Sequence, residues 1–288
     1  MKQPSSHRAL LGAFALMAAA TAAPMAMASD IAGCGAPFAE KYPDLVGKSI
    51  VMGAAPATPP YAMVDEKDPN QIIGSDIELA TAVFDCMGVD FTVKPGAWPG
   101  LFPAVVSGQI DVMFYLYYTP TRAEKGDFIT YMGSGSGALV GKGNPKGITS
   151  KGDLCGKILT AGVGTVEEKQ AAKWSDQCVA DGHEPINVMV NTDPAAGFRL
   201  VASGRADAIV SDLPLINMMV QRSPDLYEVG YSEVSPWKIG AAVANDNPLG
   251  EAIFDALKLV QGAGVQAEIF AKYGIDAELL KDTEYLPE

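Results

Sequence analysis

Arg122 is the residue whose type and position best indicate a chemical role in this 288-residue chain. It follows residues 111–118, an apolar run suited to a buried strand that Thr119-Pro120 brings to an end. Arg122 therefore lies just beyond the carboxyl end of a predicted strand, the edge at which open α/β sheets present ligand-binding groups. Its planar guanidinium fits a carboxylate. The alternative role for this arginine is an ion pair with a nearby surface acid.

The helix–strand unit that precedes Arg122 occurs a second time in the chain, and there the residue at the strand end is an acid, Asp212. The Ser-Gly-x-x-Asp motif of residues 107–111 recurs 96 positions later at residues 203–207. Each copy has an apolar helix before the glycine and an apolar strand after the aspartate, and Asp212 ends the second strand. A base and an acid that face each other across a cleft could hold a zwitterion. Alternatively, Asp212 only caps the helix that begins at Leu213-Pro214.

Strands and helices are predicted to alternate around these residues. Strands are expected at residues 49–53, 91–93, 157–161, 187–190, 208–211 and 238–243. Helices are expected after Gly74, with Ser75 or Asp76 as the cap, and at residues 101–107, 165–174, 194–203, 249–261 and 265–273. This order predicts the α/β class with mainly parallel sheets flanked by helices. The acidic tail, residues 276–288, is expected to be peripheral.

The repeat predicts two lobes of similar build. Lobe one is expected to comprise residues 29–140 and 239–288, and lobe two residues 141–238. The chain would then cross between the lobes twice, near Leu139-Val140 and near Ile239. Two lobes of this length are each large enough to hold a core of their own.

The first 28 residues are predicted to be a signal peptide. Two basic residues precede an apolar run, and Ala26-Met27-Ala28 is a small-x-small cleavage signal. The mature chain would hold 288 − 28 = 260 residues and carry a charge of (21 − 2) − 34 = −15. Such an acidic surface repels phosphates and argues against nucleic-acid binding. A lipoprotein cleavage box ending at Cys34 is the alternative, and it would tether the chain to a membrane.

Four cysteines in an exported chain are expected to pair, and four allow three connectivities. We favour Cys34 with Cys86 and Cys155 with Cys178, because each pair falls within one predicted lobe. Metal binding is disfavoured, since no C-x-x-C motif occurs and His183 is the one histidine of the mature chain. We expect no cofactor.

An ordered set of short motifs is similar to a known family. These motifs are residues 74–79, 98–104, 119–122, 127–128, 164–165, 207–212 and 265–274. Together they resemble the bacterial extracellular solute-binding proteins of family 3, the periplasmic receptors of polar amino-acid ABC importers. The resemblance covers roughly residues 48–275. It implies a two-lobed clamp of the periplasmic-binding-protein type II fold, working as a periplasmic monomer that delivers its ligand to an inner-membrane ABC permease.

The resemblance also implies a set of ligand contacts. Arg122 would hold the ligand carboxylate, helped by the amides and hydroxyl of Gly164-Thr165-Val166 at a helix start, where free N–H groups favour anions. Asp212 would take the amino group, and Trp98 would cover the side chain or simply pack in the core. The full expected set is Thr58, Trp98, Tyr117, Thr119, Arg122, Gly162, Gly164, Thr165, Val166 and Asp212.

Several positions depart from the family pattern. Ala55 stands where relatives that bind basic side chains have an acid, and Thr58 replaces an aromatic residue. Tyr115 and Tyr117 replace small residues, in a stretch one residue shorter than usual, which would turn side chains to the other face of the strand unless a bulge absorbs the change. The alternative function is a periplasmic enzyme on this fold, similar to cyclohexadienyl dehydratase, with Glu167 as its acid or base.

Overall fold

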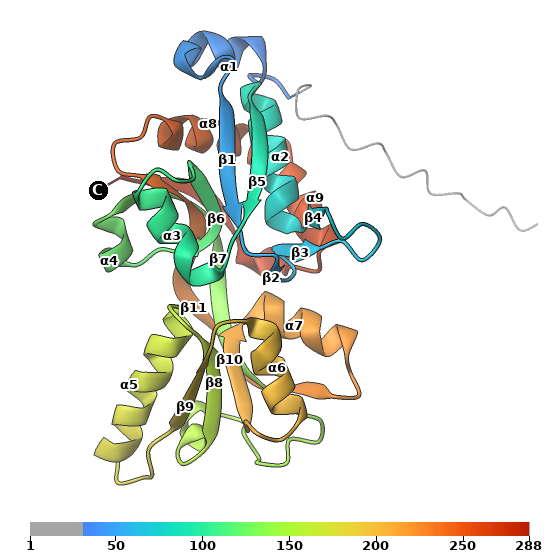
Figure 1. Ribbon diagram of the computed structural model, residues 1–288, viewed down its shortest axis with the longest axis vertical. Helices are drawn as coiled ribbons and strands as arrows, with labels where there is room; N and C mark the ends of the chain where they lie inside the picture. Colours follow the sequence, from blue (N-terminus) through green and yellow to red (C-terminus); the bar gives the residue numbers. More distant parts are fainter. Residues whose placement is uncertain (1–30, 288) are drawn as a thin grey trace, which may run out of the picture.

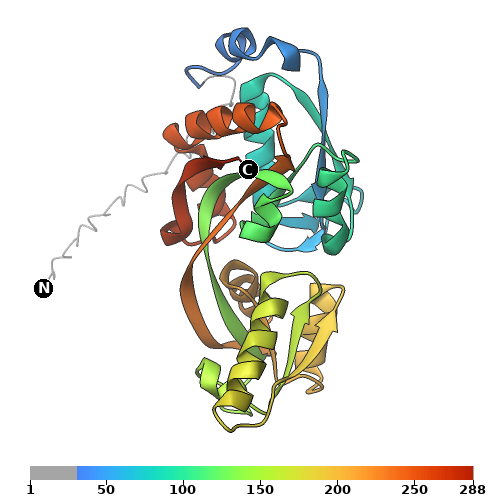
Figure 2. The same cartoon turned by 90° about the vertical axis from the view of Figure 1, so that its left-hand side faces the viewer.

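Two long antiparallel strands, β7 (Gly126–Gly141) and β11 (Tyr227–Ala244), run through both halves of the molecule (Figure 1, Figure 2). The structure is a computed structural model that describes residues 31–287, so the predicted signal peptide lies outside the described residues. Both halves share one continuous nine-stranded sheet, in the order β5-β1-β6-β11-β7-β10-β8-β9 with β12 alongside β7. None of the helices in residues 31–287 combines the length and apolar character that a bilayer crossing requires.

In the upper half, the parallel strands β1 (Ser49–Ala54), β5 (Asp90–Pro95) and β6 (Val112–Tyr117) form the sheet. All residues of β6 are buried, as expected for a strand with helices on both faces. Side chains of α2 (Ser75–Met87), α8 (Leu249–Gly262) and α9 (Val265–Lys272) share one core with the sheet. Those of α3 (Trp98–Val106) belong to a second core.

The lower half repeats this construction. Its parallel strands are β8 (Ile158–Gly162), β9 (Asn187–Asn191) and β10 (Ala208–Asp212). Helix α5 (Val166–Ala180) belongs to one core, and α6 (Pro194–Ala202) and α7 (Leu213–Arg222) belong to another. The predicted fold class, two lobes of parallel sheet flanked by helices, is confirmed.

The repeated Ser-Gly-x-x-Asp motif has the same structural role in both halves. The Asp111 carboxylate accepts a hydrogen bond from the Val51 N–H at 2.7 Å, and the Asp207 carboxylate accepts one from the Ile158 N–H at 2.8 Å. Each aspartate thus ties the helix–strand turn to the neighbouring parallel strand. The shorter elements are α1 (Ala36–Lys41), α4 (Pro120–Ala123), β2 (Ala57–Thr58), β3 (Ala62–Val64), β4 (Ile72–Ile73), β12 (Leu280–Leu286), and the 3-10 turns η2 (Pro43–Leu45), η3 (Lys151–Leu154) and η4 (Ala277–Leu279).

Two local predictions were wrong. The tail is not peripheral, because β12 pairs antiparallel with β7 from Met132 to Phe128. Helix α2 is capped by neither Ser75 nor Asp76. Its N-cap is Gly74, where a Cβ would lie 2.1 Å from the Tyr61 carbonyl oxygen. Backbone carbonyls of the Pro-rich loop accept the first amides of α2, so no side-chain cap is needed.

The strands that join the halves are β7 and β11, on which the predicted crossings near Leu139-Val140 and Ile239 fall. Within β7, residues 128–132 pair with β12 of the upper half, and residues 136–140 pair with β10 of the lower half. The intervening residues 133–135 therefore connect the halves along this strand. The predicted lobe limits, 29–140 with 239–288 and 141–238, stay a prediction.

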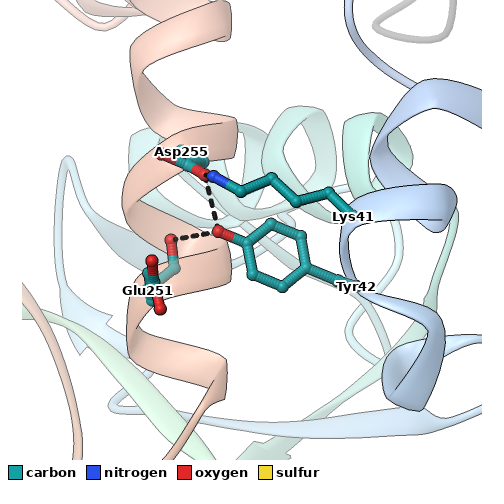
Figure 3. A network of polar contacts seen from close by, with 4 residues as sticks. All are labelled: Lys41, Tyr42, Glu251 and Asp255. Carbon is teal, nitrogen blue, oxygen red and sulfur yellow. Dashed lines mark hydrogen bonds and ion pairs between the residues drawn. The ribbon is translucent and has the colours of Figure 1, made fainter.

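The N-terminal segment is fixed to the upper half by covalent and polar contacts. Figure 3 shows the Tyr42 hydroxyl donating to the Asp255 carboxylate at 2.5 Å and to the Glu251 carbonyl at 3.5 Å, beside an ion pair between Lys41 and Asp255. These contacts join the end of α1 to α8, more than two hundred residues away in the chain. Burial together with the Asp255 hydrogen bond raises the pKa of Tyr42 to about 12, so the phenol stays a donor.

Both favoured disulfides are present, Cys34–Cys86 in the upper half and Cys155–Cys178 in the lower half. The predicted connectivity is confirmed. Because the Cys34 sulfur is bonded to Cys86, it is not available for acylation, which argues against the lipid-anchored alternative.

Candidate functional site

A cavity of about 50 Å³ lies between the two halves, where the parallel strands of each half end. Eight of the ten predicted site residues line it: Thr58, Trp98, Tyr117, Arg122, Gly162, Thr165, Val166 and Asp212. The other two, Thr119 and Gly164, lie next to it and contact Arg122. Sequence position at the carboxyl ends of strands therefore brought these side chains to one place, and their binding role stays a prediction.

Arg122 is held in the cavity wall by backbone oxygens. It belongs to the short helix α4, whose N-cap Thr119 accepts a hydrogen bond from the Arg122 N–H at 3.3 Å. The guanidinium donates to the Tyr117 carbonyl at 2.9 Å and, across the cleft, to the Gly164 carbonyl at 3.1 Å. None of the ion pairs among residues 31–287 includes Arg122, so the surface-pair alternative is not what the structure shows. Three of its five N–H donors remain for other acceptors.

Asp212 is a helix cap, as its position suggested, and it also lines the cavity. It is 1% exposed and caps α7, accepting from the Leu215 N–H at 3.1 Å. It also accepts hydrogen bonds across the cleft from the hydroxyls of Tyr61 at 2.8 Å and Tyr115 at 2.6 Å. Burial raises the pKa of Asp212, and the donated hydrogen bonds oppose that rise by stabilising the ionised form.

An aromatic cluster forms the upper wall of the cavity. The rings of Tyr61 and Tyr115 stack with centroids 3.6 Å apart, and Trp98 lies 5.3 Å from Tyr115. Trp98 is thus both packed against the upper core and part of the cavity lining. Burial raises the pKa values of Tyr61 and Tyr115 well above the usual range, so both phenols remain protonated donors.

Strand β6 contains a bulge at Tyr115. The register between β6 and β11 shifts at Gly240 and Ala242, and Tyr115 adopts a positive φ of 54°. Consecutive residues Phe114 and Tyr115 consequently belong to the same core, rather than alternating between faces. Tyr115 and Tyr117 both reach the cavity as a result.

The start of α5 has its own internal hydrogen bonds. Thr165 caps the helix by accepting from the Glu168 N–H at 3.2 Å, and its hydroxyl donates to the Gly162 carbonyl at 2.9 Å. The Gly164 N–H donates to the Glu168 carboxylate at 2.6 Å. The predicted help from the Gly164 amide is therefore not available in this conformation. Val166 begins the first helical turn, where amides have no intrahelical acceptor.

Glu167 and Asn191 are functional candidates that the predicted binding set lacked. They are 4% and 7% exposed, both line the cavity, and the Glu167 Oε1 and Asn191 Oδ1 atoms have no hydrogen-bond partner among the described residues. Burial, and next the neighbouring Asp212 charge, raise the pKa of Glu167 to about 7. Asn191 ends β9, so its position at the carboxyl end of a strand could have identified it from the sequence as a site residue. For Glu167 the sequence offered only its position beside Thr165.

Comparison with known proteins now decides the family. Residues 50–276 match the model of the bacterial extracellular solute-binding proteins, family 3. The chain belongs to this family. Its members are extracellular solute-binding proteins, and the two-lobed fold agrees with this assignment.

Individual relatives agree with this assignment. This solute-binding protein is 28% identical to the L-cystine-binding protein TcyJ of Escherichia coli (strain K12), over 78% of the present chain and 82% of TcyJ. An ancestral arginine-binding protein bound to arginine superimposes with a TM-score of 0.71 at 28% identity, over 78% of this chain and 97% of the other. The ancestral amino-acid-binding protein AncCDT-1, a precursor of cyclohexadienyl dehydratase, gives 0.70 at 26% identity, over 82% and 98%.

These relatives also bear on the enzymatic alternative. Curated relatives, TcyJ among them, are named as binding proteins, and AncCDT-1 is itself described as an ancestral amino-acid-binding protein. The function of this chain is therefore solute binding rather than catalysis.

Proposed function

We propose that this protein is the substrate-binding protein of an ABC importer, and that it carries a small zwitterion, an amino acid or a close relative of one, in the cavity between its halves. The observation that carries the proposal is the charge arrangement of the cavity. The Arg122 guanidinium, which forms no ion pair with any residue in 31–287, comes from the upper half. The carboxyl groups of Asp212 and Glu167 come from the lower half.

Because these charged groups are buried, each of them needs a compensating partner. A charged group removed from water is costly unless a partner compensates it. Arg122 loses solvation in the wall of the cleft, and burial lowers its pKa accordingly. A ligand carboxylate on the free guanidinium edge and a ligand ammonium opposite would each supply a missing partner. The relatives named for cystine and arginine binding support this ligand class.

The cavity is small because the two halves are in contact. With a volume of about 50 Å³ between halves that contact each other through Arg122 and Asp212, the conformation corresponds to a closed clamp. Entry of a ligand requires the halves to separate, and β7 and β11 are the strands on which that motion would turn. We infer a cleaved, periplasmic monomer whose acidic closed form meets the permease.

A thermal-shift screen tests the proposal. The purified mature chain is heated alone and with each of the twenty L-amino acids, L-cystine, small amines and prephenate, because a ligand that binds only the native state raises the melting temperature. We expect at least one zwitterion to stabilise the protein, and the small amines to have no effect. Stabilisation by none of the zwitterions, or turnover of prephenate, would contradict the proposed function.

A further inference from the structure

The Asp212 carboxylate has no acceptor site left for a ligand in the closed conformation. Its Oδ1 atom accepts from Tyr61 and from the Leu215 N–H, and its Oδ2 atom accepts from Tyr115 and, at 3.5 Å, from the Ser211 hydroxyl. A carboxylate offers about four lone-pair positions. All four therefore have protein donors, and two of these donors come from the opposite half of the molecule.

Glu167 presents the opposite situation. Glu167 is 4% exposed and lines the same cavity. Burial raises the pKa of its carboxyl group and hydrogen bonding from the Tyr117 and Thr165 hydroxyls lowers it, yet its Oε1 atom has no hydrogen-bond partner among the described residues. Asn191, on the neighbouring strand end, likewise has an unpaired Oδ1 atom. A buried acceptor without a donor costs about 1–3 kcal/mol, and more when it is charged. Two such acceptors around one cavity indicate a missing group that donates hydrogen bonds.

Arg122 is not the missing donor. Burial lowers the pKa of Arg122 and the Glu167 charge raises it, yet none of the ion pairs among residues 31–287 joins the two side chains. Both side chains line the cavity, so a ligand in it could contact the guanidinium and the carboxyl group together. An ammonium group has three N–H donors and could serve both Glu167 and Asn191. A quaternary ammonium has none and would leave both acceptors unpaired.

Building on the proposed function, we propose that Glu167, assisted by Asn191, binds the ligand's ammonium group. Asp212 is instead a positioning residue: it latches the lower half to Tyr61 and Tyr115 of the upper half. The ligand is thus gripped between Arg122 and Glu167, and the latch acts on the closed conformation whichever ligand is bound.

The test uses calorimetric titrations and small-angle X-ray scattering on the mature protein. The titrants are the twenty L-amino acids and L-cystine, with glycine betaine as the quaternary counterpart. The variants are Glu167→Gln, Asp212→Asn and the double variant Tyr61→Phe/Tyr115→Phe, which keeps Asp212 but removes its cross-cleft donors. Glu184→Gln, an exposed position in the same half, is the matched control. Circular dichroism confirms that each variant is folded.

We expect Glu167→Gln to weaken binding of every titrant that binds wild type by about tenfold or more, with an unchanged ligand-free radius of gyration. Asp212→Asn and the double tyrosine variant should both enlarge the ligand-free radius of gyration and weaken all titrants by one common factor, because they lower the population of the closed state. Glycine betaine should not bind. Glu184→Gln should match wild type in both measurements.

The contrary results are distinct. Wild-type affinity in Glu167→Gln, together with lost binding and an unchanged radius in Asp212→Asn, would return the ammonium to Asp212 and overturn the inference. Binding of glycine betaine would overturn the ammonium assignment. If no titrant binds wild type, the ligand class of the proposed function fails and Glu167 loses its assigned role with it, while the radius of gyration still decides whether Asp212 is a latch.

Discussion

Asp76 shows how burial alone can set the charge of a residue near the cleft. It is 3% exposed at the start of α2 and accepts a hydrogen bond from the Tyr131 hydroxyl at 3.0 Å. Burial raises its pKa to about 8, the Tyr131 bond opposes the rise, and the Asp212 charge adds to it. No cation compensates Asp76 among the ion pairs of residues 31–287, so the folded protein holds it protonated at neutral pH.

Asp76→Asn should change the pH dependence of stability. Between the ordinary pKa of 3.8 and the folded value of about 8, the unfolded chain has lost the Asp76 proton and the folded chain keeps it. The wild-type free energy of unfolding therefore falls as pH rises through this window, by at most about 1.4 kcal/mol per pH unit from this group. Asparagine cannot ionise. In urea unfolding, the free energy of unfolding of the variant relative to wild type should therefore be higher at pH 8 than at pH 5. Parallel pH profiles would refute the shifted ionisation.

Single residues were predictable where their position in an element fixed their place in space. Arg122 and Asp212 follow strand ends, and strand ends of parallel sheets meet at one edge, so the sequence placed both at the cleft. Tyr61 lies in a Pro-rich loop, and its place depends on the contact of that loop with Gly74. The burial of Glu167 in the first turn of α5 depends on how the two halves meet, which no local pattern encodes.

At the scale of elements, helices with an apolar face were predictable and the final strand was not. Residues of β12 read Leu-Lys-Asp-Thr-Glu-Tyr-Leu, and Thr283 is the one buried residue among them. A strand that lies beside β7 with a single buried residue carries no apolar alternation. Its pairing is a tertiary property, since β7 lies some 150 residues earlier in the chain.

The run Gly133-Ser134-Gly135-Ser136-Gly137 lets β7 pass closely between its neighbours. A Cβ at Gly135 would lie 2.5 Å from the Glu233 carbonyl oxygen and 2.5 Å from a Leu213 methyl carbon. Because the oxygen belongs to the paired strand β11, it cannot move without disturbing the ladder. Small residues are thus required where the chain passes from one half to the other.

Gly135→Ala should consequently destabilise the fold by about 1–3 kcal/mol, the usual cost of forcing an extra carbon into a packed region. Gly141→Ala is the control on the same strand, since a Cβ there would have its nearest neighbour at 4.0 Å. Chemical denaturation of the two variants measures the difference. Equal stability of both would show that the close approach of β7 and β11 is not required.

At the scale of the whole molecule, two similar halves hold opposite charges toward one cavity. The upper half contributes Arg122 and the tyrosine donors, and the lower half contributes the carboxyl groups and the start of α5. The duplicated helix–strand unit made the two-lobed architecture predictable from sequence. The bonds that cross the cleft could not be predicted, because they exist only when the halves meet.

Calorimetric titration of the best-binding amino acid into wild type, Arg122→Ala and Arg199→Ala tests this account most directly. Arg199 is a matched control, with a side chain 70% exposed and an ion pair to Asp193 on the surface. Loss of a buried charged partner costs about 2–5 kcal/mol in binding. We predict one site in wild type, affinity reduced by at least about 30-fold in a folded Arg122→Ala protein, and wild-type affinity in Arg199→Ala. Wild-type affinity in Arg122→Ala would contradict the claim that the cleft grips a carboxylate through this guanidinium.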